Sequence, residues 1–488
     1  MFFPPLSIRT AASLFRGAAK CPAGCYNAAS NEMTSFHIEQ FGCRATQADA
    51  AAIECQLLIR GCTASARAAE ADVVVINTCT VTANADSQAR QAIRRFHAEN
   101  PAAQIIVTGC YAQRAPEELA QIAGVSWVVG NSHKLEIAGL VAHASSLCLG
   151  SAGLLPAESL ANSDPLSLAR GPAKILSGDI FAQTDVLVAP VLGGEGDHTR
   201  PILKIQDGCN NRCSYCVIPF VRGKSRSLAP AQVIAEIHKL TAAGYQEIVV
   251  SGINLGSYGR DLTPRIELLV LLRRILDETP LARLRLSSIE PQDVTQDLVD
   301  FVAGTDRVAR HFHIPLQSAS DRILAAMHRW YRAAHYARKV ELIRETIPAA
   351  AVGADMIAGF PGETEEDHRA TMEFIERLPF SYLHAFSFSK RPGTVAENLS
   401  GEVPPHVIKQ RSRELRATGE IKKSAFRTAQ AGSTLRALTL REQGTDSSGP
   451  WTAALSDNYL QLRVPGHHPR NRFVDVRVGA EGKESLFG

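Results

Sequence analysis

Cysteine is missing from the second half of this chain, because all eleven cysteines lie at or before Cys216. A disulfide framework would not be confined in this way in a chain of 488 residues. The distribution instead favours a reducing cytoplasm, where thiols serve metal or cluster chemistry. No apolar run reaches the ~18 residues that cross a bilayer, so no membrane partner is expected. The net charge of +3 is too small to indicate a polyanion partner for the whole surface, so any nucleic-acid surface must be local.

The hydrophobic content of 45% and the charged content of 21% are ordinary for a globular protein, and the length predicts roughly two to four domains. The first segment, MFFPPLSIRTAASLFRGAAK, is basic and free of acid, as in a transit or weak signal peptide. Its apolar core is short and interrupted. We therefore prefer to interpret residues 1–32 as a non-native or disordered extension, dispensable for function, with Met33 as the real start. Cys21 and Cys25 fall in it and receive no ligand role.

Three cysteines stand at fixed spacing in the stretch IQDGCNNRCSYCVIPFVRGKSRS: Cys209, Cys213 and Cys216. A loop this tight can point three thiolates at one metal centre, which is one ligand short of what a cubane iron–sulfur cluster needs. One iron is then open to a non-protein ligand, which suits a catalyst. Tyr215 adds an aromatic surface beside the cluster. The alternative is a zinc knuckle completed by His198, although zinc sites usually show two paired clusters.

Short apolar runs alternate with helical stretches from residue 35 to about 140, which predicts a doubly wound parallel sheet with helices on its faces. The expected strands are 36–41, 73–76, 105–108 and 127–129, and the expected helices are 48–60, 86–98 and 116–122. Cys43, Cys79 and Cys110 each follow one of these strands, at the edge where ligands collect in open parallel sheets. Three unrelated buried cysteines are the alternative, and Cys55 and Cys62 fit that interpretation better.

The segments FGCRATQAD, INTCTVT, TGCYAQ and DGCNNRCSYC, in this order, resemble the methylthiotransferases of the radical S-adenosylmethionine (SAM) class. The likeness covers roughly residues 34–140 and 200–485. It implies two 4Fe–4S clusters, one on Cys209, Cys213 and Cys216 that binds SAM and cleaves it to a radical, and a second on Cys43, Cys79 and Cys110 that holds the transferred sulfur. Thr46 departs from the family pattern, which usually has Asn there, and we expect the change to affect loop hydrogen bonding only.

A second alternation of strands and helices, from about 201 to 391, predicts a partial (β/α)6 barrel whose function collects at the carboxyl ends of the strands. The expected strands are 202–205, 247–251, 283–287, 312–315, 351–355 and 382–386, and the expected helices include 230–243, 264–278 and 365–377. Polar residues follow these strands. The resemblance assigns them to a face that binds SAM and substrate: Gly252, Asn254, Ser288, Glu290, Gln317, Asp355 and Glu363. Ala319 replaces a Gly of the family pattern PLQSGS, which alanine tolerates unless φ is positive.

The remaining segments complete a five-part organisation. The N-terminal methylthiotransferase domain spans 33–140 and carries the auxiliary cluster, and the radical SAM domain spans 200–427. Residues 141–199 form a Ser-, Gly- and Pro-containing linker. A strand pair is expected in IFAQTDVLVAPVL within that linker, and Cys148 there is structural or incidental.

A basic helix over 404–427 precedes a tail of short β runs over 428–488. The charge bias of the helix favours a phosphate-facing surface, with a plain exposed helix as the alternative. LSDNYLQLRV in the tail resembles the RNA-binding TRAM module, a small β-barrel, with Arg463, Arg470 and Arg472 as candidate phosphate contacts. Helix and tail are expected to bind tRNA without taking part in the chemistry, so that loss of the tail spares SAM cleavage.

Three branches of the resembled family act on N6-threonylcarbamoyladenosine in tRNA, on N6-isopentenyladenosine in tRNA, and on a ribosomal protein aspartate. NTCTVT and IQDGCNNRCSYC are most similar to the first branch. Arg222, Lys224 and Arg226 are candidates to bind the threonyl carboxylate. The implied partners are tRNA, an electron donor such as a flavodoxin or ferredoxin, and a sulfur donor. A different class is a non-catalytic iron–sulfur RNA-binding protein, which the full set of polar strand ends disfavours.

Overall fold

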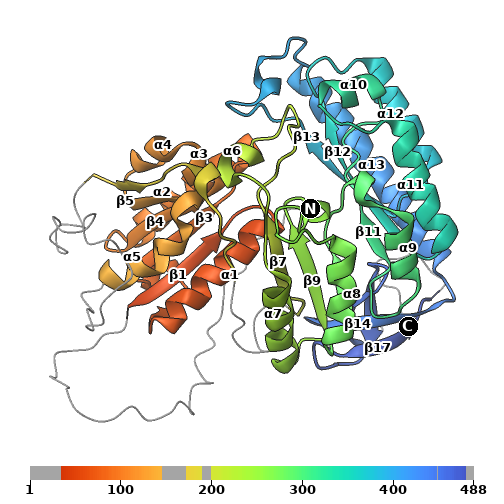
Figure 1. The fold of residues 1–488 in the computed structure, drawn as a ribbon, viewed down its shortest axis with the longest axis horizontal. Coiled ribbons are helices and arrows are strands. Elements are labelled where there is room, and N and C mark those ends of the chain that lie inside the picture. The colour runs from red at the N-terminus through yellow and green to blue at the C-terminus, as the bar shows by residue number, and fades with distance from the viewer. Residues whose placement is uncertain (1–33, 145–171, 189–198, 448, 480–488) are drawn as a thin grey trace. The chain divides into compact units, whose positions relative to one another are not determined.

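The computed structural model describes residues 34–144, 172–188, 199–447 and 449–479. The chain divides into two compact units (Figure 1). The first comprises the residues up to 197 together with Phe220–Gly223, and the second comprises 198–219 and 224–488. The N-terminal extension, Cys148 and His198 lie outside the described residues, so the expectations for them stay predictions.

The first unit is built on a six-stranded parallel sheet in the order β2-β1-β3-β4-β5-β6. Its strands are β1 Ser35–Gln40, β2 Thr63–Ala64, β3 Val73–Thr78, β4 Gln104–Gly109, β5 Val125–Gly130 and β6 Lys174–Leu176. The strand order reverses between β1 and β3. In open α/β sheets, the crevice at the carboxyl ends of two such strands is where ligands bind.

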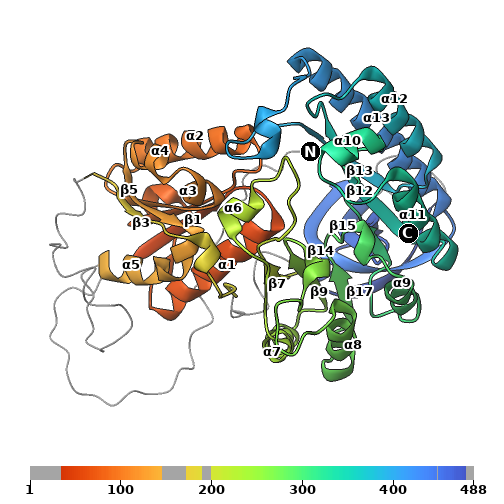
Figure 2. The same ribbon diagram turned by 45° about the horizontal axis from the view of Figure 1, so that its top comes forward.

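Helices cover both faces of this sheet, as the doubly wound prediction requires. They are α1 Arg44–Ile59, α2 Ala83–Glu99, α3 Cys110–Arg114, α4 Pro116–Ala120 and α5 Ile137–Ala144. Side chains that alternate along the strands separate two cores: α1 and α5 pack on one face, and α2 and α4 on the other (Figure 2). Burial of these apolar faces holds the layers together.

Two details of the first unit differ from the sequence prediction. The segment 174–176, predicted as linker, pairs with β5 as the edge strand β6. The strand pair expected from 180 onward is absent over the described part, Ile180–Val188. A 3-10 turn, Ile180–Ala182, forms instead, because the Asp179 side chain accepts a hydrogen bond from Phe181 N. A three-residue strand carries too little periodicity to be read from a sequence.

The second unit contains six parallel strands in sequential order. They are β7 Ile202–Asp207, β9 Glu247–Gly252, β10 Arg283–Leu286, β11 His311–His313, β12 Ala351–Ala358 and β13 Tyr382–Ser387, with the short antiparallel β8 Arg226–Ser227 beside β7. Single bridges, Leu284 to Val308 and Ser288 to His313, join β10 to the β11 segment. No pairing between β13 and β7 occurs in the described residues, so the predicted partial (β/α)6 barrel is confirmed as an open one.

Helices connect the barrel strands and flank them, as α9, α11 and α12 do beside β11 and β12 in Figure 1. They are α6 Ile218–Arg222, α7 Pro230–Ala242, α8 Leu268–Glu278, α9 Gln296–Ala303, α10 Asp321–Ala326, α11 Ala333–Thr346, α12 Glu365–Arg377 and α13 Pro405–Ala429. Helix α8 begins at Leu268, four residues later than predicted, with Glu267 as its N-cap. Helix α12 begins where predicted, at a reciprocal cap between Thr364 and Asp367.

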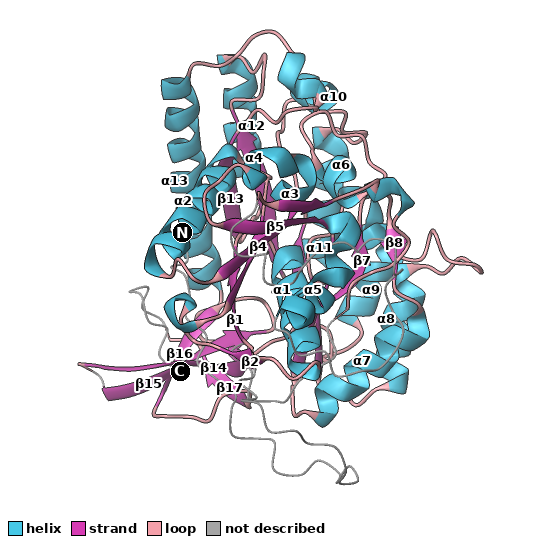
Figure 3. Ribbon diagram, turned by 90° about the vertical axis from the view of Figure 1, so that its left-hand side faces the viewer, coloured by secondary structure: helices cyan, strands magenta, loops and turns pink. Residues whose placement is uncertain are grey.

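The tail forms a four-stranded antiparallel sheet in the order β16-β15-β14-β17, seen at the lower left of Figure 3. Its strands are β14 Thr434–Asp446, β15 Gly449–Ser456, β16 Gln461–Pro465 and β17 Phe473–Arg477. Strands β16 and β17 are not paired with each other in the described residues, so the small barrel predicted from the sequence is seen as an open sheet. None of the described helices has the length and apolarity to span a bilayer.

Candidate active site

The cysteine loop of the second unit leaves the barrel at the carboxyl end of β7. The buried Gln206 side chain shapes this exit, because its Nε2 donates to the carbonyls of Asp207 and Gly208 at 3.0 and 2.7 Å. Gly208 has φ of 70°, in the left-handed region that favours glycine. The loop therefore begins at a fixed turn, at the rim where barrel enzymes place their active sites.

The three thiols of this loop lie close enough that the charge on one raises the pKa of another. Burial, together with the neighbouring Cys213 and Cys209, raises the pKa of Cys216 to about 12. Burial likewise raises the pKa of Cys209. Ionised thiols this close to one another need a nearby cation, and metal binding needs the deprotonated form of the cysteine. The set of three close sulfurs therefore fits a metal cluster.

Donors surround these sulfurs. Asn211 N donates to Cys209 Sγ at 3.4 Å, and Asn254 Nδ2 lies 4.0 Å from the same sulfur. Arg329 Nη1 lies 3.3 Å from Cys213 Sγ. Arg329, which follows α10 and is 116 residues from Cys213 in the chain, is not among the site residues expected from the sequence. Nothing in the local sequence marks it, because its role depends on a contact made only in the folded barrel.

Arg329 also joins Glu290 to the cysteine loop, since the Arg329 Nη2 and Glu290 Oε2 atoms form an ion pair. Glu290, which was predicted from the sequence, and Cys213 therefore contact the same guanidinium group, that of Arg329. Tyr215, between the last two cysteines, packs its ring against an apolar cluster that includes Met327 and Phe360.

Gly252 and Asn254, at the end of β9, lie against Gln206. A Cβ on Gly252 would stand 2.8 Å from Gln206 Oε1, so only glycine permits this approach. The same Oε1 accepts from Asn254 N at 2.9 Å. Asn254 Oδ1 is buried and has no hydrogen-bond partner within the described structure. A buried acceptor of this kind needs a donor from a ligand, which fits a cofactor bound beside Cys209.

The other predicted residues gather around β11 and β12. Ser288 bridges to the His313 backbone. The Gln317 backbone, at φ of 68°, donates to Asp355 O at 2.8 Å. Asp355 itself contacts two histidines. Ala319 is not among the residues with positive φ, and its N donates to Thr371 Oγ1 at 3.2 Å, so alanine is accommodated there.

In the first unit, Cys43, Cys79 and Cys110 follow β1, β3 and β4, as expected. Cys43 is the N-cap of α1, and Cys110 is the first residue of α3, a short helix that is not among those expected from the sequence. Burial, and then the neighbouring Cys43 and Cys110, raises the pKa of Cys79 to about 12, so these three sulfurs also lie close together. Cys79 and Cys110 are buried and Cys43 is exposed, so the group opens to the surface of this unit.

Two glycines permit this convergence. A Cβ on Gly42 would stand 2.7 Å from Cys79 Sγ, and one on Gly109 would stand 2.2 Å from Thr78 O. Thr46 takes part in loop hydrogen bonding, as expected: its Oγ1 donates to Cys43 O at 2.7 Å. Asn131 Nδ2 lies 3.7 Å from Cys110 Sγ, while the buried Asn131 Oδ1 has no hydrogen-bond partner within the described residues. Close thiols next to an unsatisfied polar atom fit a second cluster.

The basic residues after the cysteine loop do not form the expected carboxylate pocket. Arg222 is buried, and its Nη2 lies 3.0 Å from Asp49 Oδ2 within the first unit. Arg226 is also buried, and its Nη2 lies 3.9 Å from Asp207 Oδ2. Lys224 alone of the three is exposed. Both guanidinium groups are paired with carboxylates from other parts of the chain. The position of the arginines next to the cysteine loop in the sequence could not show these pairs.

Some basic residues of α13 make contacts inside the protein, and others are exposed on its surface. Arg411 is buried, with Nη1 2.9 Å from Glu363 Oε2, and Lys422 Nζ donates to the carbonyls of Glu376 and Leu378. Lys409 and Arg413 are exposed. The exposed face of α13 is therefore less basic than the sequence suggested.

Comparison with known proteins agrees with this architecture. Residues 35–130 match the uncharacterized protein family UPF0004, and residues 203–375 match the radical SAM superfamily. The structure is similar to radical S-adenosylmethionine methyltransferase TsrM from Kitasatospora setae, with a TM-score of 0.51 and 18% identity over 75% of this chain and 77% of that one. At that identity the likeness shows the fold, which is that of a radical SAM protein.

Curated relatives give the family. The threonylcarbamoyladenosine tRNA methylthiotransferase MtaB of Aquifex aeolicus is 35% identical over 90% of this chain and 99% of the relative. MtaB of Bacillus subtilis is 34% identical over 84% and 85%. The tRNA-2-methylthio-N(6)-dimethylallyladenosine synthase of Syntrophobacter fumaroxidans is 32% identical over 93% and 95%. The chain belongs to the radical SAM tRNA methylthiotransferases, enzymes that use SAM and two 4Fe–4S clusters.

Proposed function

We propose that the protein methylthiolates carbon 2 of N6-threonylcarbamoyladenosine beside the anticodon of tRNA, giving 2-methylthio-N6-threonylcarbamoyladenosine. Two separate groups of three cysteines, each at the carboxyl ends of parallel strands, support the reaction. The 35% identity to a relative named for this substrate, over 99% of its length, supports the choice of nucleoside.

The residues divide the work between the two units. Cys209, Cys213 and Cys216 would hold the cluster that binds SAM, and Cys43, Cys79 and Cys110 would hold the auxiliary one. When bound, the first cluster supplies the electron that opens SAM for attack on an unactivated C–H bond, which no side chain can break. Arg329 keeps a positive charge 3.3 Å from Cys213 Sγ and fixes Glu290.

The proposed cofactor face comprises Tyr215, Gly252, Asn254, Ser288, Glu290 and Gln317. Gly252 lets the Gln206 side chain approach the end of β9, and Asn254 Oδ1 is a buried acceptor without a partner among the described residues. Their rigid placement on strand ends orients the cofactor without reorganisation during the reaction.

The proposed partners follow from the reaction. The tail sheet, as a TRAM-like module, and the exposed face of α13 bind tRNA through residues such as Arg413 and Arg472. An electron donor such as a flavodoxin or ferredoxin and a separate sulfur donor complete the turnover. The eight cysteines of the described residues form no disulfide with one another, which suits a reducing cytoplasm.

The test of the substrate uses purified, cluster-loaded enzyme with SAM and a reductant on two tRNAs, one bearing N6-threonylcarbamoyladenosine and one bearing N6-isopentenyladenosine. Nucleoside mass spectrometry is expected to find the methylthio product only with the first tRNA. Product formation only with the isopentenyl tRNA would overturn the substrate, while leaving the radical reaction in place.

The test of the two clusters counts iron in triple variants. Replacing Cys209, Cys213 and Cys216 by Ala is expected to halve the bound iron, from about eight to about four per chain, and to abolish SAM cleavage. Replacing Cys43, Cys79 and Cys110 is expected to halve the iron and to retain some SAM cleavage. Unchanged iron in either variant contradicts the assignment.

A further inference from the structure

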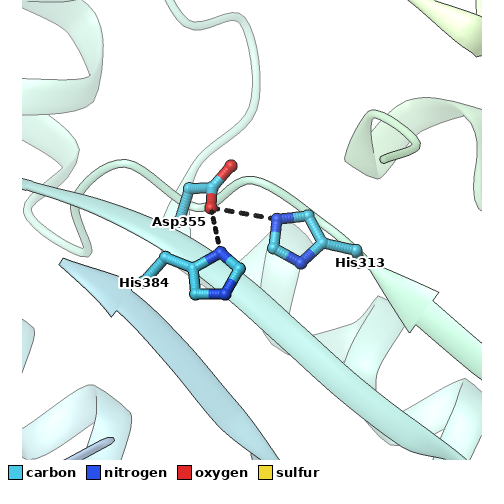
Figure 4. Close-up of side chains that lie close together, drawn as sticks. All are labelled: His313, Asp355 and His384. Carbon is cyan, nitrogen blue, oxygen red and sulfur yellow. Dashed lines mark hydrogen bonds and ion pairs between the residues drawn. The ribbon is translucent and has the colours of Figure 1, made fainter. Parts of the chain in front are cut away.

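Three side chains on neighbouring barrel strands converge below the rim (Figure 4). Asp355 Oδ1 lies 3.0 Å from His313 Nε2 and 3.2 Å from His384 Nδ1. The residues come from β12, β11 and β13, so strand pairing, rather than a flexible loop, sets their spacing. The sequence marked only Asp355, because the two histidines lie inside strands and look like ordinary strand residues.

A fourth side chain locks this group. Tyr382 OH lies 2.9 Å from His313 Nδ1 and 2.8 Å from His311 Nε2, so both ring nitrogens of His313 are engaged. The Tyr382 ring has room because residue 353 is glycine: a Cβ there would stand 2.1 Å from Tyr382 Cζ. A buttress of this kind holds the neighbouring imidazole and carboxylate in one geometry before any ligand arrives.

The group faces the open interior of the barrel. Ala354 and Met356 are fully buried, whereas Asp355 between them keeps 24% of its side chain exposed, as alternation along a strand requires. The His384 side chain is 54% exposed. Phe386, two residues further along the same face of β13, is 47% exposed and offers a flat apolar ring beside it.

Two polar atoms at this face are available to a ligand. His384 uses Nδ1 on Asp355, which leaves its Nε2 toward the interior. The second carboxylate oxygen of Asp355 points away from both imidazoles (Figure 4). Although burial raises it, the charges and hydrogen bonds of His313 and His384 hold the pKa of Asp355 below its usual value, so the carboxylate is ionised. In its protonated form an imidazole donates from both ring nitrogens, so His384, bonded to Asp355 at Nδ1, can then also donate from Nε2.

We propose that His384 and Asp355 recognise the polar N6-substituent of the substrate nucleoside, with His384 Nε2 donating to the threonyl carboxylate and the outer oxygen of Asp355 accepting from the threonyl hydroxyl. This inference rests on the proposed function and names the part of the protein that selects its substrate. Phe386 supplies the apolar surface on which the adenine ring stacks.

His384 and Asp355 can bind the threonyl group, which needs polar partners that Arg222 and Arg226 do not supply. Burying the threonyl carboxylate without a partner costs several kcal/mol, and Arg222 and Arg226 are already paired. An isopentenyl group, being apolar, would leave His384 and Asp355 facing it without hydrogen bonds. A site built to bond a polar group rejects an analogue that lacks it far more strongly than an apolar pocket rejects an added group.

The experiment compares two anticodon stem–loop RNAs on each enzyme sample. One carries N6-threonylcarbamoyladenosine, and the other carries its methyl ester, in which the carboxylate is neutral. The ratio of kcat/KM for acid over ester cancels differences in active fraction between preparations. The wild-type enzyme is expected to prefer the acid roughly 10- to 100-fold, the effect of a hydrogen bond to a charged group.

His384→Phe is expected to bring this ratio near one, and Asp355→Asn to lower it in the same direction, because His384 then loses its orienting anion. His384→Gln, which keeps a donor, is expected to retain part of the preference. The matched control is His238→Phe on the exposed surface of α7, which is expected to keep the wild-type ratio.

Two results overturn the inference while leaving the proposed function in place: a wild-type enzyme that modifies the acid without preferring it to the ester, and a His384→Phe variant that keeps the full preference. A third concerns metal, because the three ligand atoms also lie within 4.8 Å of one another. One zinc ion per chain that is lost in both His384→Phe and Asp355→Asn would make the group a metal site. A wild-type enzyme that modifies only isopentenyl RNA overturns both proposals.

Discussion

Arg329 places a positive charge at the radical SAM cysteine loop. Its side chain is 3% exposed, and its guanidinium group contacts both Cys213 Sγ and the Glu290 carboxylate. A cation beside a thiolate stabilises the ionised sulfur that a cluster needs. The same cation compensates a carboxylate that is itself only 16% exposed. One side chain therefore has both a structural and a chemical task, and substitutions can separate the two.

We predict that Arg329→Met destabilises the protein by about 3 kcal/mol, because it leaves Glu290, whose side chain is only 16% exposed, as a carboxylate without its cation. The double variant Arg329→Met with Glu290→Gln is expected to recover most of this loss, since the neutral amide no longer needs a cation. It is not expected to recover SAM cleavage, because Cys213 still lacks its positive neighbour. Urea unfolding measures the first effect and a SAM cleavage assay the second. Full cleavage in the double variant would show that Arg329 is purely structural.

Gly42 decides whether three sulfurs can meet in the first unit. We predict that Gly42→Ala lowers bound iron from about eight to about four per chain, because the new Cβ would stand 2.4 Å from Cys79 Cβ at a φ of +105°. SAM cleavage is expected to persist, since the other cysteine loop is unchanged.

Gly61→Ala is the matched control for this prediction. Gly61 has a similar φ of +83° but nothing within 4 Å of its Cβ position. It therefore carries the same kind of backbone strain without the clash, and it is expected to keep full iron content. Equal iron loss in the two variants would mean that strain in general, rather than contact with Cys79, disturbs the cluster.

At the scale of elements, the sequence predicted the strands that carry cysteines, and the structure shows why. Strands such as β3 and β4 are buried on both faces, so they appear as continuous apolar runs bounded by turn residues. A cysteine directly after such a run must lie at the sheet edge, which local sequence suffices to show. Contacts between elements leave no such trace. Arg329 and His384 acquire their partners only when distant strands and loops meet.

The charged residues of helix α13 likewise have contacts that the local sequence does not show. The sequence shows seven basic residues on it, but one of them, Arg411, is buried against Glu363, 48 residues away. Basic residues lie on both the buried and the exposed face of this helix. Its basic residues therefore fall into an inward set that anchors the helix and an outward set that can meet phosphate.

We predict that substitutions on α13 separate these two sets. Arg411→Gln is expected to cost about 3–5 kcal/mol of stability, because Glu363 is buried and loses its cation. Lys409→Gln and Arg413→Gln are expected to leave stability unchanged and to weaken tRNA binding, with the slope of log Kd against log salt falling by about one for each phosphate that is no longer neutralised. Filter binding across salt concentrations measures this, and an unchanged slope in the Lys409→Gln, Arg413→Gln double variant would assign that face to solvent.

At the scale of the whole molecule, the tail sheet belongs to the body of the second unit. Arg285, fully buried within β10, donates to the Ser456 and Asp457 carbonyls at 2.9 and 3.0 Å. Arg283 donates to Arg436 O at 2.7 Å. Glu247 lies between the two arginines with its carboxylate fully buried. The side of the barrel opposite the active-site rim is thus closed by carbonyl groups of the tail.

We predict that removing residues 428–488 lowers the midpoint of thermal unfolding and the iron content, and does not simply weaken tRNA binding. The sequence alone predicted that SAM cleavage would survive this truncation. The structure predicts its loss, because Arg283 and Arg285 would lose three carbonyl acceptors and Ala351 would lose the apolar residues that cover it. The point variant Arg472→Gln, which changes an exposed side chain, is the comparison and is expected to weaken tRNA binding at an unchanged midpoint. A truncated chain with full iron, an unchanged midpoint and wild-type SAM cleavage would show that the barrel folds without its tail.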